Sequence, residues 1–427
     1  MQTNLASTYR QRRQNLIALA ANGVFLIGSP GMSPDTVLWD KNLAYLTGLT
    51  DRSAYLLIVP QGVSVEFPET RSTPELMRGH TVHEILFMQP RAEQDVFMEG
   101  EAPTFAEILA ATGVDRVFPL DQMHATLQRA LMTTDTLWLN TPPTPQLDQP
   151  LSDDMRLASQ IRERFYWIAL KNVAPIIHQM RFVKDTDEVA SLREAFEIQC
   201  DIFQKIMMAL EPGENESLGQ AIFDYEIQIR PDHVGHGMGD ELYEASIIVG
   251  SGINSAIPHY LHNNKIIQDG DLILIDSGVS VNGYRSDITR TFPANGKFTP
   301  RQREVYAAVL EAEDAAIATM KPGSTMLQAH QAAYAVFEKY GLAQYCYGNC
   351  GHPVGLNIHD ANGRWPDDRE QPFEPGVVVV IEPFLMMPHE NMGIRIEDGV
   401  LITESGHEAL AGPPRTIEAV EALCRRS

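Results

Sequence analysis

The sequence predicts an α/β protein built from two domains, residues 1–174 and residues 175–427. Three observations predict this fold class. The chain has 427 residues, which is enough for two domains of ordinary size. Its first ~170 residues alternate helix-like with strand-like segments. The rest of the chain repeats one order of elements twice, a pair of helices followed by strands.

The N-terminal elements are short and alternate in type. Helical periodicity runs from about residue 9 to residue 21. Short apolar strands are expected at residues 24–27, 55–59 and 85–88. Four prolines within residues 141–150 predict a loop or linker, and a helical stretch over about residues 153–170 follows it. Together these elements predict a small α/β domain.

Asp185 predicts the first helix of the second domain. Glu188 stands three residues after it, which is the spacing of a capping box. Leu192 and Phe196 then give the helix an apolar face. We therefore place the domain boundary just before this segment, near residue 174.

The C-terminal half contains a faint internal duplication. One helix ends at Pro212-Gly213 and another at Pro322-Gly323, and a new helix follows each, at an offset of 322 − 212 = 110. The second copy opens at Thr299, with an N-cap threonine, a proline at the first helical position and an N3 glutamine. Chance similarity is the alternative, because Pro-Gly after a helix is common. Two related halves would pack as a pseudo-symmetric unit with a cleft between them.

Composition and charge exclude several classes of protein. Hydrophobic residues make up 44% and charged residues 21%, as in an ordinary globular protein. No run of about 18 apolar residues occurs, so no transmembrane helix and no membrane partner are expected. The formal net charge of −23 argues against nucleic acid, which needs a basic surface. It suits a protein that holds divalent cations, although solubility alone would also explain it.

The cysteines and the first residues indicate the compartment. Four cysteines in so long a chain do not make a disulfide framework. They are Cys200, Cys346, Cys350 and Cys424. The first sixteen residues are polar and lack the apolar core of a signal peptide. A reduced, cytoplasmic protein is therefore expected.

Each half of the duplication carries two acids at matching places. In the first half Asp276 ends an apolar run and Asp287 follows on the same hairpin. In the second half Glu382 ends the β-branched run 377–381 and Glu397 follows. The offsets are 397 − 287 = 110 and 382 − 276 = 106. One such acid could simply end a strand in water, but four converging carboxylates stay ionised only beside cations.

Two histidines precede the second pair of acids. His352 and His359 lie seven residues apart on a glycine-containing segment, and either could be structural or a ligand. Cys346 and Cys350 lie close by, but C-x-x-x-C without a second cysteine pair is a weak zinc pattern. One histidine with four carboxylates is a hard ligand set that favours Mn²⁺ over a thiolate-type zinc site. Two such metals about 3.5–4 Å apart ionise a shared water and polarise a carbonyl, which is apparatus for hydrolysis.

At these residues the sequence resembles the pita-bread metallopeptidases, the group that contains methionine aminopeptidase, prolidase, aminopeptidase P and creatinase. The order Asp, Asp, His, Glu, Glu matches, and the resemblance covers about residue 181 to the C-terminus. Residues 43–49 and 84–88 also look like the N-terminal domain of aminopeptidase P. The resemblance implies a curved, mainly antiparallel sheet with helices outside, after a smaller creatinase-like α/β domain.

The resemblance also implies a role for each metal ligand. Asp276 would bind one metal, and His352 with Glu382 would bind the other. Asp287 and Glu397 would bridge both. Two divalent ions per subunit are implied, with Mn²⁺ expected and Zn²⁺, Co²⁺ or Fe²⁺ open.

Further residues match positions near the substrate. Glu382 would also move the proton between the attacking water and the leaving amine. His259 matches a histidine that lines the substrate site, and His359 one that contacts the substrate carbonyl. Arg395 matches an arginine that orients the acids, and Arg369 a substrate-side arginine. The alternatives are a plain loop histidine for His259, a structural ion pair for Arg395 and a solvated loop residue for Arg369.

One departure from the family pattern concerns the substrate pocket. The family often has another histidine four residues before the metal histidine, and here that position is Gly348. The expected reaction is hydrolysis of the bond before a proline in second position, which releases the N-terminal residue. A prolidase acting on Xaa-Pro dipeptides is the first alternative, and a creatinase-like amide hydrolase or a non-catalytic relative follows. The resemblance also implies a homodimer or homotetramer.

Overall fold

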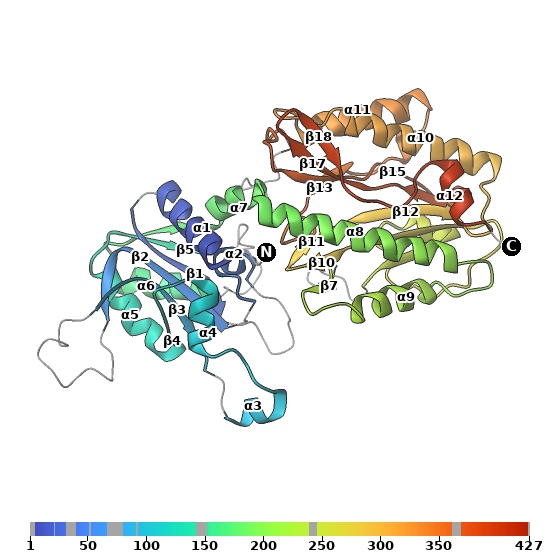
Figure 1. Ribbon diagram of the computed structural model, residues 1–427. Helices are drawn as coiled ribbons and strands as arrows, with labels where there is room; N and C mark the ends of the chain where they lie inside the picture. The colour runs from blue at the N-terminus through green and yellow to red at the C-terminus, as the bar shows by residue number, and fades with distance from the viewer. Residues whose placement is uncertain are drawn as a thin grey trace, which may run out of the picture. The chain divides into compact units, whose positions relative to one another are not determined.

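The computed structural model describes most of the chain (Figure 1). The described residues are 5–20, 22–30, 40–50, 53–65, 80–90, 93–141, 151, 153–238, 246–360 and 369–425. The chain forms two compact units, Met1–Met180 and Arg181–Ser427. The boundary expected after residue 174 falls six residues earlier than this division (180 − 174), at the first residue of helix α7, Ala174–Phe182.

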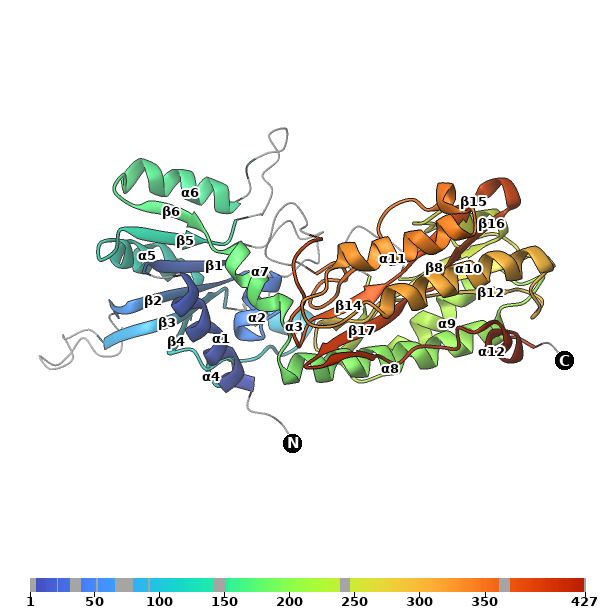
Figure 2. The same cartoon turned by 90° about the horizontal axis from the view of Figure 1, so that it is seen from above.

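The described part of the N-terminal unit forms a mixed sheet in the order β4-β3-β2-β1-β5-β6, whose strands lie side by side in Figure 2. The strands are β1 Val24–Pro30, β2 Ser53–Val65, β3 His80–Met88, β4 Arg116–Pro119, β5 Thr136–Leu139 and β6 Ala169–Asn172. The first three pair antiparallel, whereas β4, β5 and β6 join in parallel. The helices are α1 Leu5–Ala20, α2 Lys41–Thr47, α3 Glu93–Glu99, α4 Phe105–Thr112, α5 Met123–Leu131 and α6 Asp153–Arg164.

Both faces of this sheet are buried at its centre, as its apolar strands require, whereas the edge strands β4 and β6 are partly exposed. Along β1, Leu26 packs in one core cluster with residues of α5 and α6. Its neighbours Phe25 and Ile27 point to the other face and are equally inaccessible. The three strands expected from the sequence lie inside β1, β2 and β3, and this part of the prediction is confirmed.

The helix expected over residues 153–170 was predicted too long. Helix α6 ends at Arg164, and residues from Ala169 onward form β6, which pairs in parallel with β5. The break is made by the main chain, where the N–H of Ile168 donates to the carbonyl of Phe165 at 2.9 Å. Pairing with a distant strand overrides the local helical periodicity here.

The C-terminal unit is built from helix pairs and antiparallel strands. Its helices are α8 Thr186–Ala209, α9 Ser217–Gln228, α10 Pro300–Ile317, α11 Met326–Lys339 and α12 Ile417–Leu423. The strands of its first half are β7 Val234–His236, β8 Ile248–Ser251, β9 Leu272–Ser277, β10 Val279–Val281, β11 Tyr284–Arg285 and β12 Ile288–Pro293. Those of its second half are β13 Gly351–Pro353, β14 Val378–Ile381, β15 Phe384–Met387, β16 Met392–Arg395, β17 Asp398–Thr403 and β18 Gly406–Ala409. Within the described ranges the pairings in these sheets are antiparallel.

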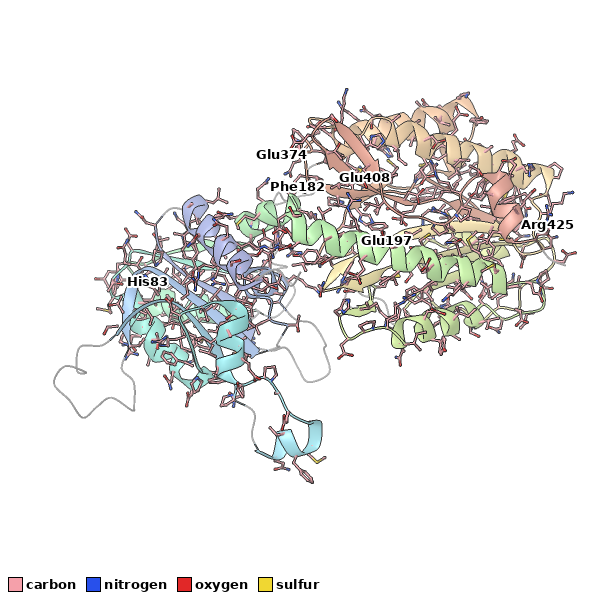
Figure 3. The ribbon with its side chains drawn as sticks, in the orientation of Figure 1. His83, Phe182, Glu197, Glu374, Glu408 and Arg425 are labelled. Atoms are coloured by element: carbon pink, nitrogen blue, oxygen red, sulfur yellow. The ribbon has the colours of Figure 1, made fainter. Side chains whose placement is uncertain are left out.

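The two halves have the order that the duplication predicts. Helices α8 and α9 precede β7–β12, and α10 and α11 precede β13–β18. In Figure 1 helices α10 and α11 border the unit on one side and α9 on the other, with strands between them. The capping boxes expected at Asp185 and Thr299 are both confirmed. Arg193 of α8 forms a bidentate ion pair with Glu408 of β18, which is labelled in Figure 3, so the first long helix and the last strand of the unit are joined.

Over the part of the chain that the structure describes, none of the helices combines the length and the apolar character needed to span a membrane.

Candidate metal centre

The first two predicted ligands lie on one hairpin. Asp276 is near the end of β9, whose preceding residues are completely buried, and Asp287 directly precedes β12. The two strands pair antiparallel with Thr289 opposite Asp276. The hairpin therefore brings both carboxylates to the same end of the sheet.

The other three predicted ligands come from the second half. Glu382 directly follows β14, and its N–H donates to the carbonyl of Cys350 at 2.8 Å. His352 lies on β13 opposite Val380 of β14. Glu397 directly precedes β17, and its N–H donates to the carbonyl of Thr289 at 3.1 Å. This last bond joins the ligand segments of the two halves.

The side chains converge. One ligand atom from each of Asp287, His352 and Glu397 lies within 4.8 Å of the others, which is the spacing of a metal-binding cluster. The Nε2 atom of His352 is 3.5 Å from Oδ2 of Asp287 and 3.7 Å from Oε1 of Glu382. Asp276 joins the group through Arg395, whose Nη2 donates to its Oδ2. The structure thus brings the five predicted ligands to one place.

The buried acids of this cluster are poorly satisfied by the protein alone. Burial first, and then repulsion from Asp276 and Glu382, raises the pKa of Asp287 well above its ordinary value. Burial and the charges of Asp287 and Glu382 likewise raise the pKa of Glu397. One Glu397 oxygen accepts from Oγ1 of Thr289 at 2.7 Å, but Oε1 is buried with no hydrogen-bond partner among the described residues. An unpartnered buried carboxylate oxygen among several acids fits divalent cations.

Arg395 is buried, and its guanidinium group contacts the acid cluster. Besides Asp276, it contacts Thr289, whose Oγ1 accepts from the Arg395 Nε at 2.9 Å. The same hydroxyl donates to Glu397, so Thr289 links the arginine to a predicted bridging acid. Arg395 therefore contacts one acid directly and a second acid through Thr289.

The two predicted substrate-side histidines lie next to the cluster and are exposed. The ring of His359 lies 4.1 Å from the ring of His352, centroid to centroid. Burial first, and then the positive charge of Arg395, lowers the pKa of His259. Asp276, Glu382 and His359 also act on His259, so all these groups share one electrostatic environment. Exposed histidines beside buried acids are placed to meet a ligand arriving from solvent.

Other candidate residues from the sequence are less well supported. Arg369 is exposed, and the loop from residue 361 to residue 368 lies outside the described residues. Burial raises the pKa of the Cys350 thiol to about 12, which disfavours the thiolate that a zinc site needs. Gly348 has φ near 100°, a left-handed conformation that a histidine rarely adopts.

Sequence reasoning missed Thr289. It lies two residues after Asp287, so both side chains fall on the same face of the strand, and this period-2 spacing was the available signal. Glu216 and Arg290 were also missed, because their partners are distant in the sequence.

Comparison with known proteins agrees with this geometry. The profile of metallopeptidase family M24 matches residues 190–404, and that of the aminopeptidase P N-terminal domain matches residues 9–138. The chain is similar to the Xaa-Pro aminopeptidase of Escherichia coli, with 34% identity over 59% of this chain and 62% of that protein. It is also similar to the mitochondrial intermediate cleaving peptidase 55 of Arabidopsis thaliana, with 28% identity over 97% of this chain and 82% of that protein.

A solved structure shows the same likeness in three dimensions. Aminopeptidase P from Escherichia coli with the inhibitor Pro-Leu superposes with a TM-score of 0.81 at 26% identity, over 98% of each chain. The expected fold class, an N-terminal α/β domain followed by a pita-bread unit, is confirmed.

Proposed function

This chain belongs to metallopeptidase family M24, and we propose that it is a metal-dependent aminopeptidase that hydrolyses the bond between an N-terminal residue and a following proline. The observation that carries the hydrolase assignment is the buried cluster of Asp287, His352 and Glu397 with its unpartnered carboxylate oxygen. The preference for proline is supported by relatives that are named Xaa-Pro aminopeptidase.

The proposed site holds two divalent cations. Asp276 would bind one and His352 with Glu382 the other, while Asp287 and Glu397 would serve both. Mn²⁺ is the expected ion because the ligand set is rich in oxygen, and Zn²⁺, Co²⁺ and Fe²⁺ are the other candidates. When bound, such cations supply Lewis-acid polarisation and a water of lowered pKa.

The chain's own residues would position the peptide and move the proton. Glu382 is half-buried at the edge of the cluster, where it can take a proton from the attacking water and give it to the leaving amine. His359 is exposed beside His352 and can donate a hydrogen bond to the scissile carbonyl as negative charge develops on it. His259 would line the same site, and Arg395 would hold Asp276 in place.

The acids would also select the end of the peptide. The two cations would offset the charge of the four carboxylates, so in the metal-loaded site the free α-amine would be recognised at close range, by carboxylate oxygens that accept its N–H bonds. The free α-amine of a peptide is largely cationic at neutral pH. Recognition of this group explains an exopeptidase that removes one N-terminal residue at a time.

The test is a comparison of substrate length with metal content measured on the same sample. We expect the metal-loaded protein to cleave Xaa-Pro-Yaa tripeptides and longer peptides with proline in second position. Cleavage confined to Xaa-Pro dipeptides would make it a prolidase instead. Cleavage of an amidino compound would favour a creatinase-like hydrolase. Absence of metal-dependent hydrolysis of all these compounds would refute the proposal.

Two further expectations belong to this proposal. The low cysteine content predicts a cytoplasmic protein, and the family resemblance predicts a homodimer or homotetramer. Cell fractionation and analytical ultracentrifugation measure these two properties directly.

A further inference from the structure

We propose that Glu216 is a positioning residue, which fixes the loop that carries His259 so that this histidine meets the peptide in one orientation. The inference rests on the proposed function. Glu216 is completely buried at the start of helix α9, but its side chain does not cap that helix. The carboxylate turns instead to the segment between β8 and β9, and His259 belongs to that segment.

The loop from Ser251 to Lys265 is organised around this carboxylate. Oε1 accepts from the N–H and the hydroxyl of Ser251 at 2.7 and 2.8 Å, and from Nδ2 of Asn254 at 3.1 Å. Oε2 accepts from the hydroxyl of Tyr260 and the N–H of Lys265, both at 2.9 Å. One side chain thus receives five donor groups from four residues spread over the loop. Charge-assisted bonds of this kind are stronger than bonds between neutral groups.

The loop closes on Glu216 at both of its ends. The N–H of Glu216 donates to the carbonyl of Lys265 at 3.0 Å. The ammonium group of Lys265 reaches back to the hydroxyl of Ser251 at 3.1 Å and to Asp271 at 2.5 Å. The entry and the exit of the loop are therefore held together.

His259 is fixed through its neighbour. Tyr260 is buried in a small core cluster with Ile248 and Leu274, and its hydroxyl reaches Glu216. His259 precedes it and is exposed. The backbone of His259 is therefore joined directly to a residue whose side chain is fixed twice, in the apolar cluster and at Glu216.

The same loop touches the strand that carries Arg395. The short 3₁₀ helix η3, Gly252–Ala256, lies against β16, where the N–H of Gly393 donates to the hydroxyl of Ser255 at 2.8 Å. A Cβ atom at Gly393 would lie 2.0 Å from the carbonyl oxygen of Ser255, so the approach requires glycine. The loop is therefore anchored at β16 as well as at Glu216.

The second half of the unit holds its histidine by a different device. At the duplication offset of 110, the position that matches Glu216 is Met326, which is apolar. His359 is instead followed by the buried Asp360, which pairs with Arg181 and lies 3.5 Å from the ammonium group of Lys184. A buried carboxylate thus supports the segment that carries each histidine. Glu216 does so for His259 and Asp360 for His359, and the two carboxylates do not occupy matching positions in the two halves.

The test is Glu216→Gln in the metal-loaded, full-length protein with a proline-second tripeptide. The glutamine keeps the shape, but its NH₂ group must face donors where a carboxylate oxygen accepted. We expect the ratio kcat/KM to fall by about 10- to 100-fold, the scale on which a misplacement near 1 Å acts. Metal content should stay at the wild-type level. Glu226→Gln is the matched control, because Glu226 lies on the same helix and pairs with Lys205 at 2.6 Å, and its kcat/KM should not change.

A double-mutant cycle separates positioning from mere stability. If Glu216 acts through His259, Glu216→Gln should cost little further kcat/KM in a His259→Ala background. The melting temperature should fall equally in both backgrounds. If Glu216→Gln does not fold, Tyr260→Phe takes its place as the test. It removes one of the five donors to Glu216 and should lower kcat/KM by a few fold. Full additivity in the cycle, or wild-type kcat/KM in Glu216→Gln, would overturn the proposal.

A second readout does not depend on activity. The ring resonances of His259, assigned by their loss in His259→Ala, should shift in zinc-loaded Glu216→Gln and stay unchanged in Glu226→Gln. Unshifted resonances in Glu216→Gln would contradict the positioning role. If the wild-type protein cleaves none of the peptides, the proposed function fails, while this spectrum still decides the role of Glu216.

Discussion

Glu397 and Asp398 are consecutive acids at the start of β17, yet their carboxylates lie in opposite electrostatic surroundings. Glu397 belongs to a cluster in which four acids face one arginine and one histidine. Asp398 belongs to a cluster in which three acids, Asp398, Glu313 and Asp314, face two arginines. Its Oδ1 lies 2.5 Å from Arg290, its Oδ2 lies 3.3 Å from Arg415, and Arg415 also reaches Glu313 at 3.1 Å.

The difference lies in the number of cationic side chains that each cluster contains. In the Asp398 cluster two arginines partner the acids, although burial and the charge of Asp398 raise the pKa of Glu313, and one Glu313 oxygen is buried without a hydrogen-bond partner among the described residues. Arg290 is completely buried and also donates to the carbonyls of Glu397 and Thr289, so it supports the backbone of the neighbouring site. In the Glu397 cluster four acids share one arginine, an excess of negative charge that cations from outside the chain would offset. Substitutions in the two clusters should therefore lower different properties. Those in the Glu397 cluster should lower metal content and activity, and those in the Asp398 cluster should lower the free energy of unfolding.

Asp287→Asn should give the largest effect. It removes a predicted bridging ligand, so metal content and activity should fall together. The loss of activity should exceed the roughly 100-fold that loss of an outer partner of a metal ligand costs. Metal analysis and peptide cleavage on one sample measure this. Asp398→Asn is the control, since it should lose stability and keep its metal, and full activity in Asp287→Asn would refute the bridging role.

Arg290→Met should give the next largest effect, and here on stability. It leaves Asp398 and the main-chain carbonyls of Thr289, Glu397 and Pro413 without their buried donor, which should cost about 3–5 kcal/mol. Denaturant unfolding measures the free energy. The double variant Arg290→Met/Asp398→Asn should lose less than the sum of the single losses, because the two groups form one pair. If the two losses simply add, the pairing of Arg290 with Asp398 does not contribute to the free energy of unfolding.

Removal of metal should lower the stability of the protein, because the acids of the Glu397 cluster then lose the cations that offset their charge. A cation whose free concentration is 100 times its dissociation constant adds about 2.7 kcal/mol to the free energy of unfolding. Chelation should therefore lower the melting temperature by about 5–10 °C in the wild-type protein. In Asp287→Asn the decrease should be much smaller. Equal melting temperatures of the wild-type protein with and without a chelator would argue against a metal that stabilises the fold.

These clusters also show how far the sequence could be interpreted. Asp276 and Glu382 end apolar runs, so their positions were visible as local breaks in a pattern. Glu216 and Arg290 look like ordinary polar residues in the sequence. Their importance comes from partners 35 to 123 positions away, which no local periodicity encodes. The end of α6 was misplaced for the same reason, because pairing of β6 with β5 decides it.

Asp154 in the N-terminal unit provides the smallest test of the comparison. It lies on α6, and burial first, and then the charge of Asp40, raises its pKa to about 7. Asp40 itself accepts from the N–H of Leu43 and from Asn140, and Tyr55 also faces the pair. As in the Glu397 cluster, acid faces acid, but among the residues that the structure describes these two carboxylates belong to no group of three potential metal ligands.

The sign of the pH dependence follows from this shift. The folded protein binds the Asp154 proton more tightly than the unfolded chain, whose pKa is near 3.9, so stability falls as the pH rises from about 4 to about 7. Asp154→Asn should therefore raise stability above pH 7, by on the order of 1 kcal/mol after allowance for partial exposure. Near pH 4 the gain should vanish. Melting curves of both proteins between pH 4 and pH 7 test this pH dependence. The same curves with added metal test whether Asp154 binds a cation, because the stability gained in Asp154→Asn would then change with metal.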